Sequence, residues 1–158
     1  MGRSIFEKVG SISPAAMATV AERRFGDAKA LADTNDNARA NGVLYLSGFV
    51  IEILLKVQLV KRYPHIAKKS PDKLTDSERD VWRLIWRQHD LALMLKLLPQ
   101  LQTAIKVRSE RRGENYFDDL KKISASWSIY ARYSPHAIQM KEAQDWLRRV
   151  RSLKELLK

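Results

Sequence analysis

The stretch GVLYLSGFVIEILLKVQLV, residues 42–60, decides how this chain folds. A transmembrane helix needs about 20 mostly apolar residues, and the stretch comes close to that length. It carries Glu52 and Lys56 in its middle, however, and an ionised group at the centre of a bilayer costs roughly 2.5–3.5 kcal/mol on insertion scales. We therefore expect a buried helix at the centre of a helical bundle, and no contact with a membrane.

Glu52 and Lys56 are the two polar side chains that this apolar stretch has to accommodate. On a helix they are neighbours one turn apart, with the acid first, which is the favourable order. Such a pair is either a structural ion pair or part of a site, and desolvation makes a buried ion pair weak evidence for stability. The residues alone favour the structural interpretation. Lys56 could also extend to solvent and leave Glu52 in need of another cation.

Length and composition indicate one domain that spans residues 1–158, with residues 1–12 as a flexible N-terminal segment. The chain has no cysteine, which excludes disulfides and thiolate metal sites and fits a reducing compartment. The N-terminus has no long apolar core followed by small residues, so we expect no signal peptide. Cytoplasmic localisation is the corresponding expectation.

The net charge of +11 favours an anionic partner such as RNA, DNA, a nucleotide or an acidic protein. Many small basic proteins bind no nucleic acid, so charge alone does not decide between these outcomes. The basic residues gather in three stretches: KRYPHIAKK at 61–69, KVRSERR at 106–112 and LRRVRSLKELLK at 147–158.

Helical spacing of apolar residues dominates the sequence, and alternating strand patterns are weak. The pattern predicts an all-α, up-and-down bundle of roughly five to seven helices. Ser13 and Pro14 should begin the first helix, and Pro64 should end the second, which starts near residue 37. The other predicted helices follow Thr75 or Asp76, begin after Asp90, and cover residues 101–108, 117–131 and 143–157.

The segment SWSIYARYSPH, residues 126–136, holds a second polar group that does not fit simple core packing. Trp127 and Ala131 should share one helix face, with Arg132, Tyr133 and His136 at the helix end. Arg132 could pair with a carboxylate such as Glu52, or bind a phosphate through two hydrogen bonds. It could also be a cation at a helix C-terminus, where positive charge is favoured in any case.

His89 is the third candidate, and its ordinary interpretation is a loop or cap histidine. Its functional interpretation is a general base or hydrogen-bond donor near Arg132. His65, His89 and His136 are not spaced as a zinc set, so we expect no metal and no cofactor. The four tryptophans are interpreted as packing residues before base-stacking ones.

Four segments in this order resemble HEPN domains, the higher eukaryotes and prokaryotes nucleotide-binding family, from about Arg24 to the C-terminus. They are RFGDAKAL (24–31), YLSGFVIEILLKVQLV (45–60), HDLALMLKLLP (89–99) and SWSIYARYSP (126–135). The most specific part is the spacing of Gly48, Glu52, Leu55 and Lys56. The resemblance implies a helical bundle that forms a homodimer, often as a toxin or phage-defence protein beside a small nucleotidyltransferase.

Ribonuclease members of this family carry an Arg, usually followed by a polar residue, and a His, with four to six residues between the Arg and the His. The resemblance implies that this His acts as a general acid or base on RNA and that the Arg stabilises the charge of the phosphorane. Here Tyr133 follows Arg132, only three residues separate Arg132 from His136, and Pro135 interrupts the helical phase between them. The chain is therefore more similar to the non-nuclease branch, which is thought to bind nucleotide-like ligands or assist a partner enzyme.

Residues and resemblance together lead to one expected function and its rivals. The expected function is a homodimeric binding module for a nucleotide or RNA phosphate, with Glu52, Lys56, Trp127, Arg132 and Tyr133 at the ligand. The alternative is a metal-independent endoribonuclease that uses Arg132 with His136 or His89. A third interpretation is an interaction protein whose basic face binds an acidic antitoxin or another partner.

Overall fold

The computed structural model describes residues 13–127 and 138–158, and all regular structure in these two ranges is helical. The all-α class is confirmed, and neither range contains a strand. The expectation for residues 1–12 and those for Ala131, Arg132, Tyr133 and His136 lie outside the described residues. The elements are α1 (Pro14–Asp33), η2 (Asn37–Arg39), α2 (Ala40–Arg62), α3 (Pro64–Ala67), η3 (Pro71–Lys73), α4 (Asp76–Trp86), α5 (Leu91–Lys96), α6 (Pro99–Arg112), α7 (Tyr116–Ser126) and α8 (Met140–Leu157).

The described ranges hold eight α-helices, one more than the upper end of the expected range. The unexpected helix is α3, a single turn that starts at Pro64, directly after α2 ends. Proline ends one helix because it lacks the amide hydrogen, and it is equally suited to the first position of the next. Residues Pro64–Ala67, which follow α2 almost directly, are thus helical.

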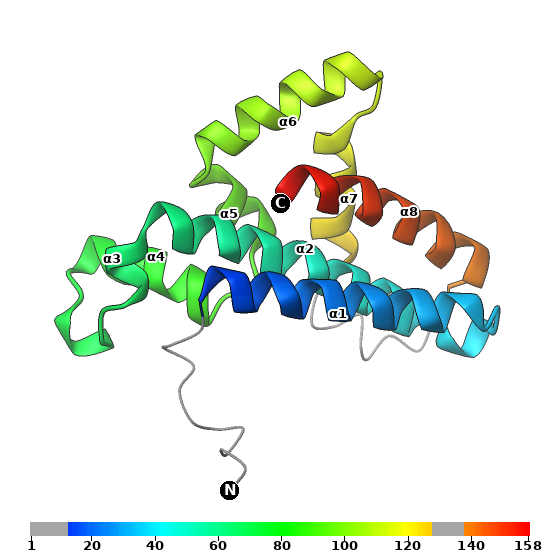
Figure 1. Ribbon diagram of the computed structural model, residues 1–158, viewed down its shortest axis with the longest axis horizontal. Coiled ribbons are helices and arrows are strands. Elements are labelled where there is room, and N and C mark those ends of the chain that lie inside the picture. Colours follow the sequence, from blue (N-terminus) through cyan, green and yellow to red (C-terminus); the bar gives the residue numbers. More distant parts are fainter. Residues whose placement is uncertain (1–12, 128–137) are drawn as a thin grey trace, which may run out of the picture.

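Helices α1 and α8 both pack along α2 and contact each other, while α3 and α4 lie at one end of the molecule and α7 crosses behind α8 (Figure 1). Two contacts fix the direction of α8 along α2. The backbone N–H of Met140 donates to Asn37 Oδ1 (2.7 Å) just before the start of α2, and Gln58 donates to the carbonyl of Leu157 (2.8 Å) near the other end. The start of α8 thus lies beside the start of α2, and the two helix ends also lie together. Helices α2 and α8 therefore run parallel, and the bundle is not the strict up-and-down bundle that the sequence predicts.

Helix α2 is the central helix, as its sequence predicts. The segment Asn37–Arg62 is long and apolar enough to cross a membrane by length and composition, and 67% of its 18-residue apolar window is buried inside the fold. The side chains of α1, α4, α5 and α8 cover it. A buried core helix passes the same length and composition test, so the burial agrees with the expected role in the core.

Local side-chain chemistry explains where several helices begin. Ser13 accepts a hydrogen bond from the N–H of Ala16 (3.1 Å), and Asp90 accepts one from the N–H of Leu93 (2.8 Å). Thr75 and Glu78 form a capping box in which each side chain bonds the other residue's backbone N–H. These caps satisfy amide groups that a helix start leaves without partners, and they confirm the predicted starts at Ser13, Thr75 and Asp90.

One predicted helix ends earlier than its sequence pattern suggests. The apolar spacing predicts a helix that continues through Trp127, whereas α7 ends at Ser126 and the backbone of Trp127 is extended (φ −93°, ψ 101°). The prediction for Trp127 was therefore wrong. A tertiary contact of its indole ring, described below, outweighs helix propensity there.

The capping box predicts a pH-dependent contribution to stability. Hydrogen bonds from Lys69 and from the Thr75 backbone lower the pKa of Glu78 from 4.5 to about 2. A lowered pKa stabilises the fold above the unfolded value of 4.5, and the effect disappears as the pH falls toward 2. In urea unfolding, Glu78→Gln should be less stable than the parent at neutral pH, and the difference should vanish in that acidic range. Glu110→Gln, at an exposed position of α6, is the control for the loss of a surface charge. A loss of stability in Glu78→Gln that stays the same at every pH would contradict the prediction.

Candidate functional site

Glu52 lies inside the core and is held first by its own helix. Its side chain is 1% exposed, and Lys56 Nζ lies 2.6 Å from Glu52 Oε1. Lys56 is itself buried, so it pairs with Glu52 and does not extend to solvent. The ion pair that the four-residue spacing predicts is therefore present. Burying either charge alone would be strongly unfavourable, which makes the two side chains depend on each other.

His89 reaches the same carboxylate from another part of the chain. Its Nδ1 lies 2.9 Å from Glu52 Oε1, although the two residues are 37 positions apart. The Arg87 N–H bonds the carbonyl of Arg83 at the end of α4, and Asp90 caps α5, so the backbone on both sides of His89 is fixed. An ionised carboxylate only accepts hydrogen bonds, so Nδ1 must carry the proton in this contact.

The exposure of His89 distinguishes it from an ordinary buried histidine. Its side chain is 54% exposed while that of its partner Glu52 is 1% exposed. With Nδ1 bonded to Glu52, Nε2 is the ring nitrogen left for other chemistry. A neutral ring accepts a proton or hydrogen bond at Nε2, and a protonated ring donates one there. The structure thus presents an imidazole whose orientation is set by a buried acid.

The second oxygen of Glu52 is less well satisfied than the first. Oε1 faces both Lys56 and His89, whereas Oε2 is buried and has no hydrogen-bond partner among the described residues. Most buried polar atoms in proteins have a partner, because burying one without a hydrogen bond costs about 1–3 kcal/mol. Oε2 therefore keeps acceptor capacity that the described residues leave unused.

Trp127 closes the group from the end of α7. Its Nε1 donates to the backbone carbonyl of Tyr45 (2.9 Å), and its ring lies edge-on to His89 with the ring centres 6.2 Å apart. The indole passes directly over Gly48, where any Cβ would overlap the ring. The missing side chain of Gly48 is what leaves room for the indole. The contact explains why the chain leaves the helix at Trp127.

The structure therefore brings together four of the seven predicted site residues. We call Glu52, Lys56, His89 and Trp127 the Glu52 site. Glu52 contacts both Lys56 and His89. Arg132, Tyr133 and His136 lie outside the described residues. The sequence analysis missed Tyr45 and Phe49, whose rings stack on each other, with Tyr45 also stacked with Trp127. The available signal was that the two aromatic residues are four positions apart on the helix that carries Glu52.

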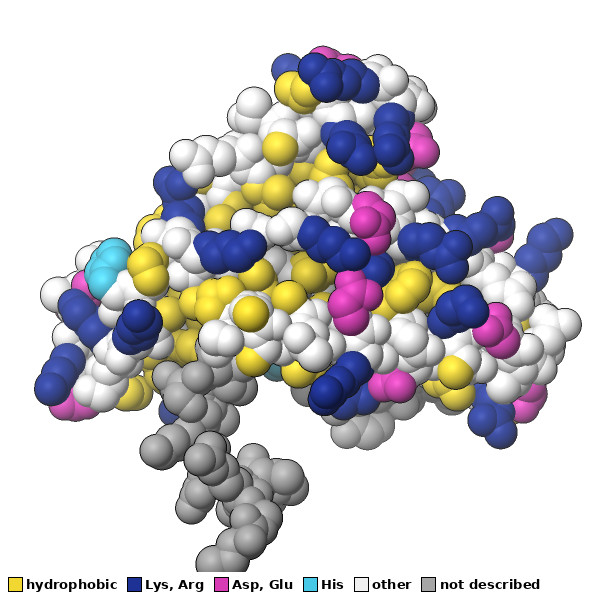
Figure 2. Space-filling view, in the orientation of Figure 1, with side chains coloured by type: hydrophobic (Ala, Val, Ile, Leu, Met, Phe, Trp, Pro, Cys, Tyr) yellow, Lys and Arg dark blue, Asp and Glu magenta, His cyan; other side chains and the backbone are white. Residues whose placement is uncertain are grey.

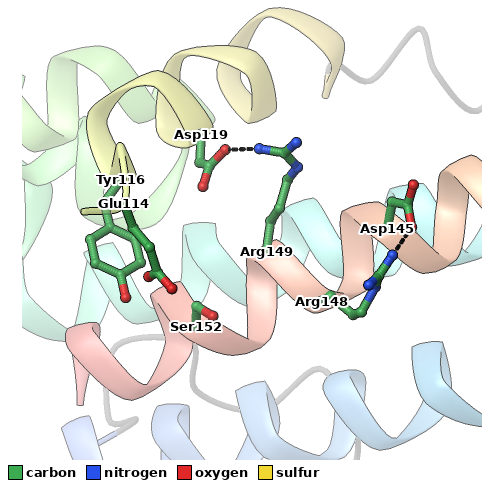
Figure 3. A pocket seen from close by; sticks show the side chains of 7 residues that line it. All are labelled: Glu114, Tyr116, Asp119, Asp145, Arg148, Arg149 and Ser152. Atoms are coloured by element: carbon green, nitrogen blue, oxygen red, sulfur yellow. Dashed lines mark hydrogen bonds and ion pairs between the residues drawn. The ribbon is translucent and has the colours of Figure 1, made fainter. Parts of the chain in front are cut away.

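A separate polar hollow of about 350 Å³ lies where the start of α7 faces α8 (Figure 3). Arg149 pairs with Asp119 and Arg148 pairs with Asp145, and Glu114 adds a third carboxylate to the wall. Burial raises the pKa of the Tyr116 phenol at the same place. Because carboxylates already neutralise both arginines, this hollow is poorly suited to a phosphate even though α8 belongs to a basic stretch.

Comparisons with known proteins add no family to this picture. No protein-family model, curated protein or solved structure matches the chain. Within residues 13–127 and 138–158, no cluster of three or more His, Asp or Glu side chains could hold a metal ion. The chemistry of the Glu52 site therefore has to be inferred from its own side chains.

The contact between Gly48 and Trp127 gives a direct stability test. Gly48→Ala should destabilise the fold by about 1–3 kcal/mol, because its Cβ would displace the buried indole. Gly26→Ala on α1 is the matched control, since nothing lies within 4 Å of its Cβ position. Alanine there should stabilise α1 by about 0.5–1 kcal/mol. Chemical denaturation measures both; equal effects of the two substitutions would show that Trp127 does not occupy the space over Gly48.

Proposed function

We propose that this chain is a HEPN-like binding module that holds a phosphate of a nucleotide or RNA at the Glu52 site. The observation that supports this proposal is the buried Glu52 carboxylate, which orients a half-exposed His89. As part of the same proposal, the module is a cytoplasmic homodimer that acts beside a partner such as a nucleotidyltransferase or an antitoxin, in a toxin–antitoxin or defence system. Arg132 and Tyr133 belong to the proposed ligand contacts.

The charges at the site are compatible with an anion. Lys56 lies against Glu52, so one positive charge offsets the buried negative one. Protonated His89 would donate from Nε2 to a phosphate oxygen. The net charge of +11 adds long-range attraction for any anion.

Aromatic side chains support a nucleotide over a simple inorganic anion. Tyr45 and Phe49 are half-buried on α2, with ring centres 6.3 Å apart, and Tyr45 also stacks with Trp127. Bases bind to proteins largely by stacking on such rings. Trp127 itself is 6% exposed, so we assign it the task of holding His89 in place and not that of stacking. The base would lie on the partly exposed rings.

The test is isothermal titration with a panel of nucleotides and short RNAs at low ionic strength, where phosphate contacts are strongest. We expect binding by the parent protein, and roughly tenfold to a hundredfold weaker binding by His89→Gln, because a charge-assisted hydrogen bond contributes about 1.5–3 kcal/mol. His65→Gln, at an exposed position of α3, is the matched control. No binding by the parent at low ionic strength would refute the proposal, as would equal loss in the two histidine variants.

The same observation favours one alternative, a metal-independent endoribonuclease. Nε2 of His89 would take the proton of a 2′-hydroxyl, the 2′-oxygen would attack phosphorus, and the leaving 5′-oxygen would receive a proton from His136 or from the same ring. Arg132 would stabilise the charge that develops on the phosphate. General acid/base groups of this kind contribute about 10²–10⁴-fold in rate.

Cleavage of RNA in the presence of a metal chelator distinguishes this alternative from binding alone. If the chain is a nuclease, His89→Ala and Arg132→Ala should each lose at least a hundredfold in rate, while His65→Ala should cleave like the parent. Intact RNA with every form, or cleavage equal in the parent and the Arg132→Ala protein, would exclude the enzyme.

A further inference from the structure

A second groove lies at the end of the molecule formed by α3 and α4, and it shares no residue with the Glu52 site. Its volume is about 560 Å³. The segment Ala67–Pro71 forms one wall, and Trp82, Trp86 and Arg87 form the other. Lys and Arg side chains also gather on the α3 and α4 end of the face shown in Figure 2. The groove thus combines an aromatic wall with a basic rim.

The two tryptophans of this groove have different roles. Trp86 packs against the main core cluster and donates from Nε1 to the carbonyl of Ala67 (3.3 Å), so it holds α4 on α3. Trp82 is not among the residues packed in either core cluster of the described chain. Its ring instead carries the guanidinium of Arg87, 5.4 Å from the ring centre. Trp86 therefore packs against the core, whereas the ring of Trp82 lies outside both core clusters and contacts Arg87.

Two cations of the groove are available to a ligand. Lys69 is occupied, because its Nζ lies 2.7 Å and 2.8 Å from the two carboxylate oxygens of Glu78. Lys68 and Arg87 are exposed and make no ion pair with a residue that the structure describes. An unpaired lysine and an arginine stacked on an indole thus lie beside the same hollow. This arrangement differs from the hollow between α7 and α8, where carboxylates hold both arginines.

We propose that this groove binds a single strand of RNA, with a base stacked on the Trp82–Arg87 pair and backbone phosphates on Lys68. Single-stranded nucleic acids are bound by this combination of aromatic faces and cations along a groove. An acidic peptide would use the cations but would leave the indole face without a purpose. The choice of RNA over DNA rests on the proposed function, whereas the groove and its chemistry do not.

The experiment measures the affinity of a fluorescently labelled single-stranded RNA for the full chain by anisotropy. Trp82→Leu keeps an apolar side chain and removes the ring, and we expect roughly tenfold weaker binding. Trp82→Phe keeps a stacking face and should restore much of the affinity. Because Trp82 lies outside the core clusters, both variants should keep the parent's melting temperature. Parent-like RNA affinity in Trp82→Leu would overturn the proposal.

The salt dependence of binding tests the phosphate contact separately. For a single strand, each phosphate contact contributes about 0.7 to the slope of log affinity against log salt. Lys68→Ala should therefore lower that slope by about 0.7. Lys141→Ala, at an exposed position at the start of α8, is the matched control and should leave the slope unchanged. Equal slopes for the parent and Lys68→Ala would remove Lys68 from the site.

Two further arms separate this proposal from the one on the Glu52 site and from a protein partner. RNA binding that weakens in Trp82→Leu and persists in His89→Gln supports the groove, even if no nucleotide binds at the Glu52 site. Binding that weakens only in His89→Gln overturns the groove and leaves the proposed function standing. A polyglutamate peptide that displaces the RNA, and binds as tightly in Trp82→Leu as in the parent, would assign the surface to acidic proteins and overturn the RNA proposal.

Discussion

The burial of α2 on almost every side is the constraint on which the rest of the structure depends. The helix is apolar around most of its circumference between Val43 and Val60, so neighbours must cover several faces at once. Helix α1 covers one side and α8 another, while α4 and α5 close the far end. An antiparallel partner on each side would be the simplest solution. The chain instead brings α8 alongside α2 in the same direction.

The same burial creates the Glu52 site. A carboxylate in the centre of a buried helix needs cations or donors close by, and both Lys56 and His89 meet it at Oε1. The loop between α4 and α5 places His89 there because caps on both sides fix its backbone. The buried acid of α2 therefore needs partners, and its contact with His89 sets the orientation of that ring. A site of this kind arises when the residue that satisfies a buried charge remains half in solvent.

The sequence was sufficient for what depends on local pattern and insufficient for what depends on distant contacts. Caps at Ser13, Thr75 and Asp90, and the central position of α2, follow from neighbouring residues and were predicted. The parallel course of α8 was not, because helix direction is set by long-range packing that no single helix encodes. The early end of α7 also escaped prediction. Helical spacing continues past Ser126, and only the space over Gly48 shows why Trp127 turns inward.

The distribution of charge shows why net charge alone does not locate a binding surface. All three basic stretches contribute to the value of +11, yet on α8 the charges of Arg148, Arg149 and Lys154 are matched by carboxylates. Lys154 illustrates the extreme: it is buried, lies 2.8 Å from a Glu22 oxygen, and its hydrogen bond lowers the pKa of that acid. Cations of this kind stabilise helix packing and cannot also serve a ligand. Near α3 and α4 the balance differs, because Glu78 engages Lys69 and leaves Lys68 and Arg87 unpaired within the described chain. A basic surface can therefore bind a ligand where its cations make no ion pair within the fold.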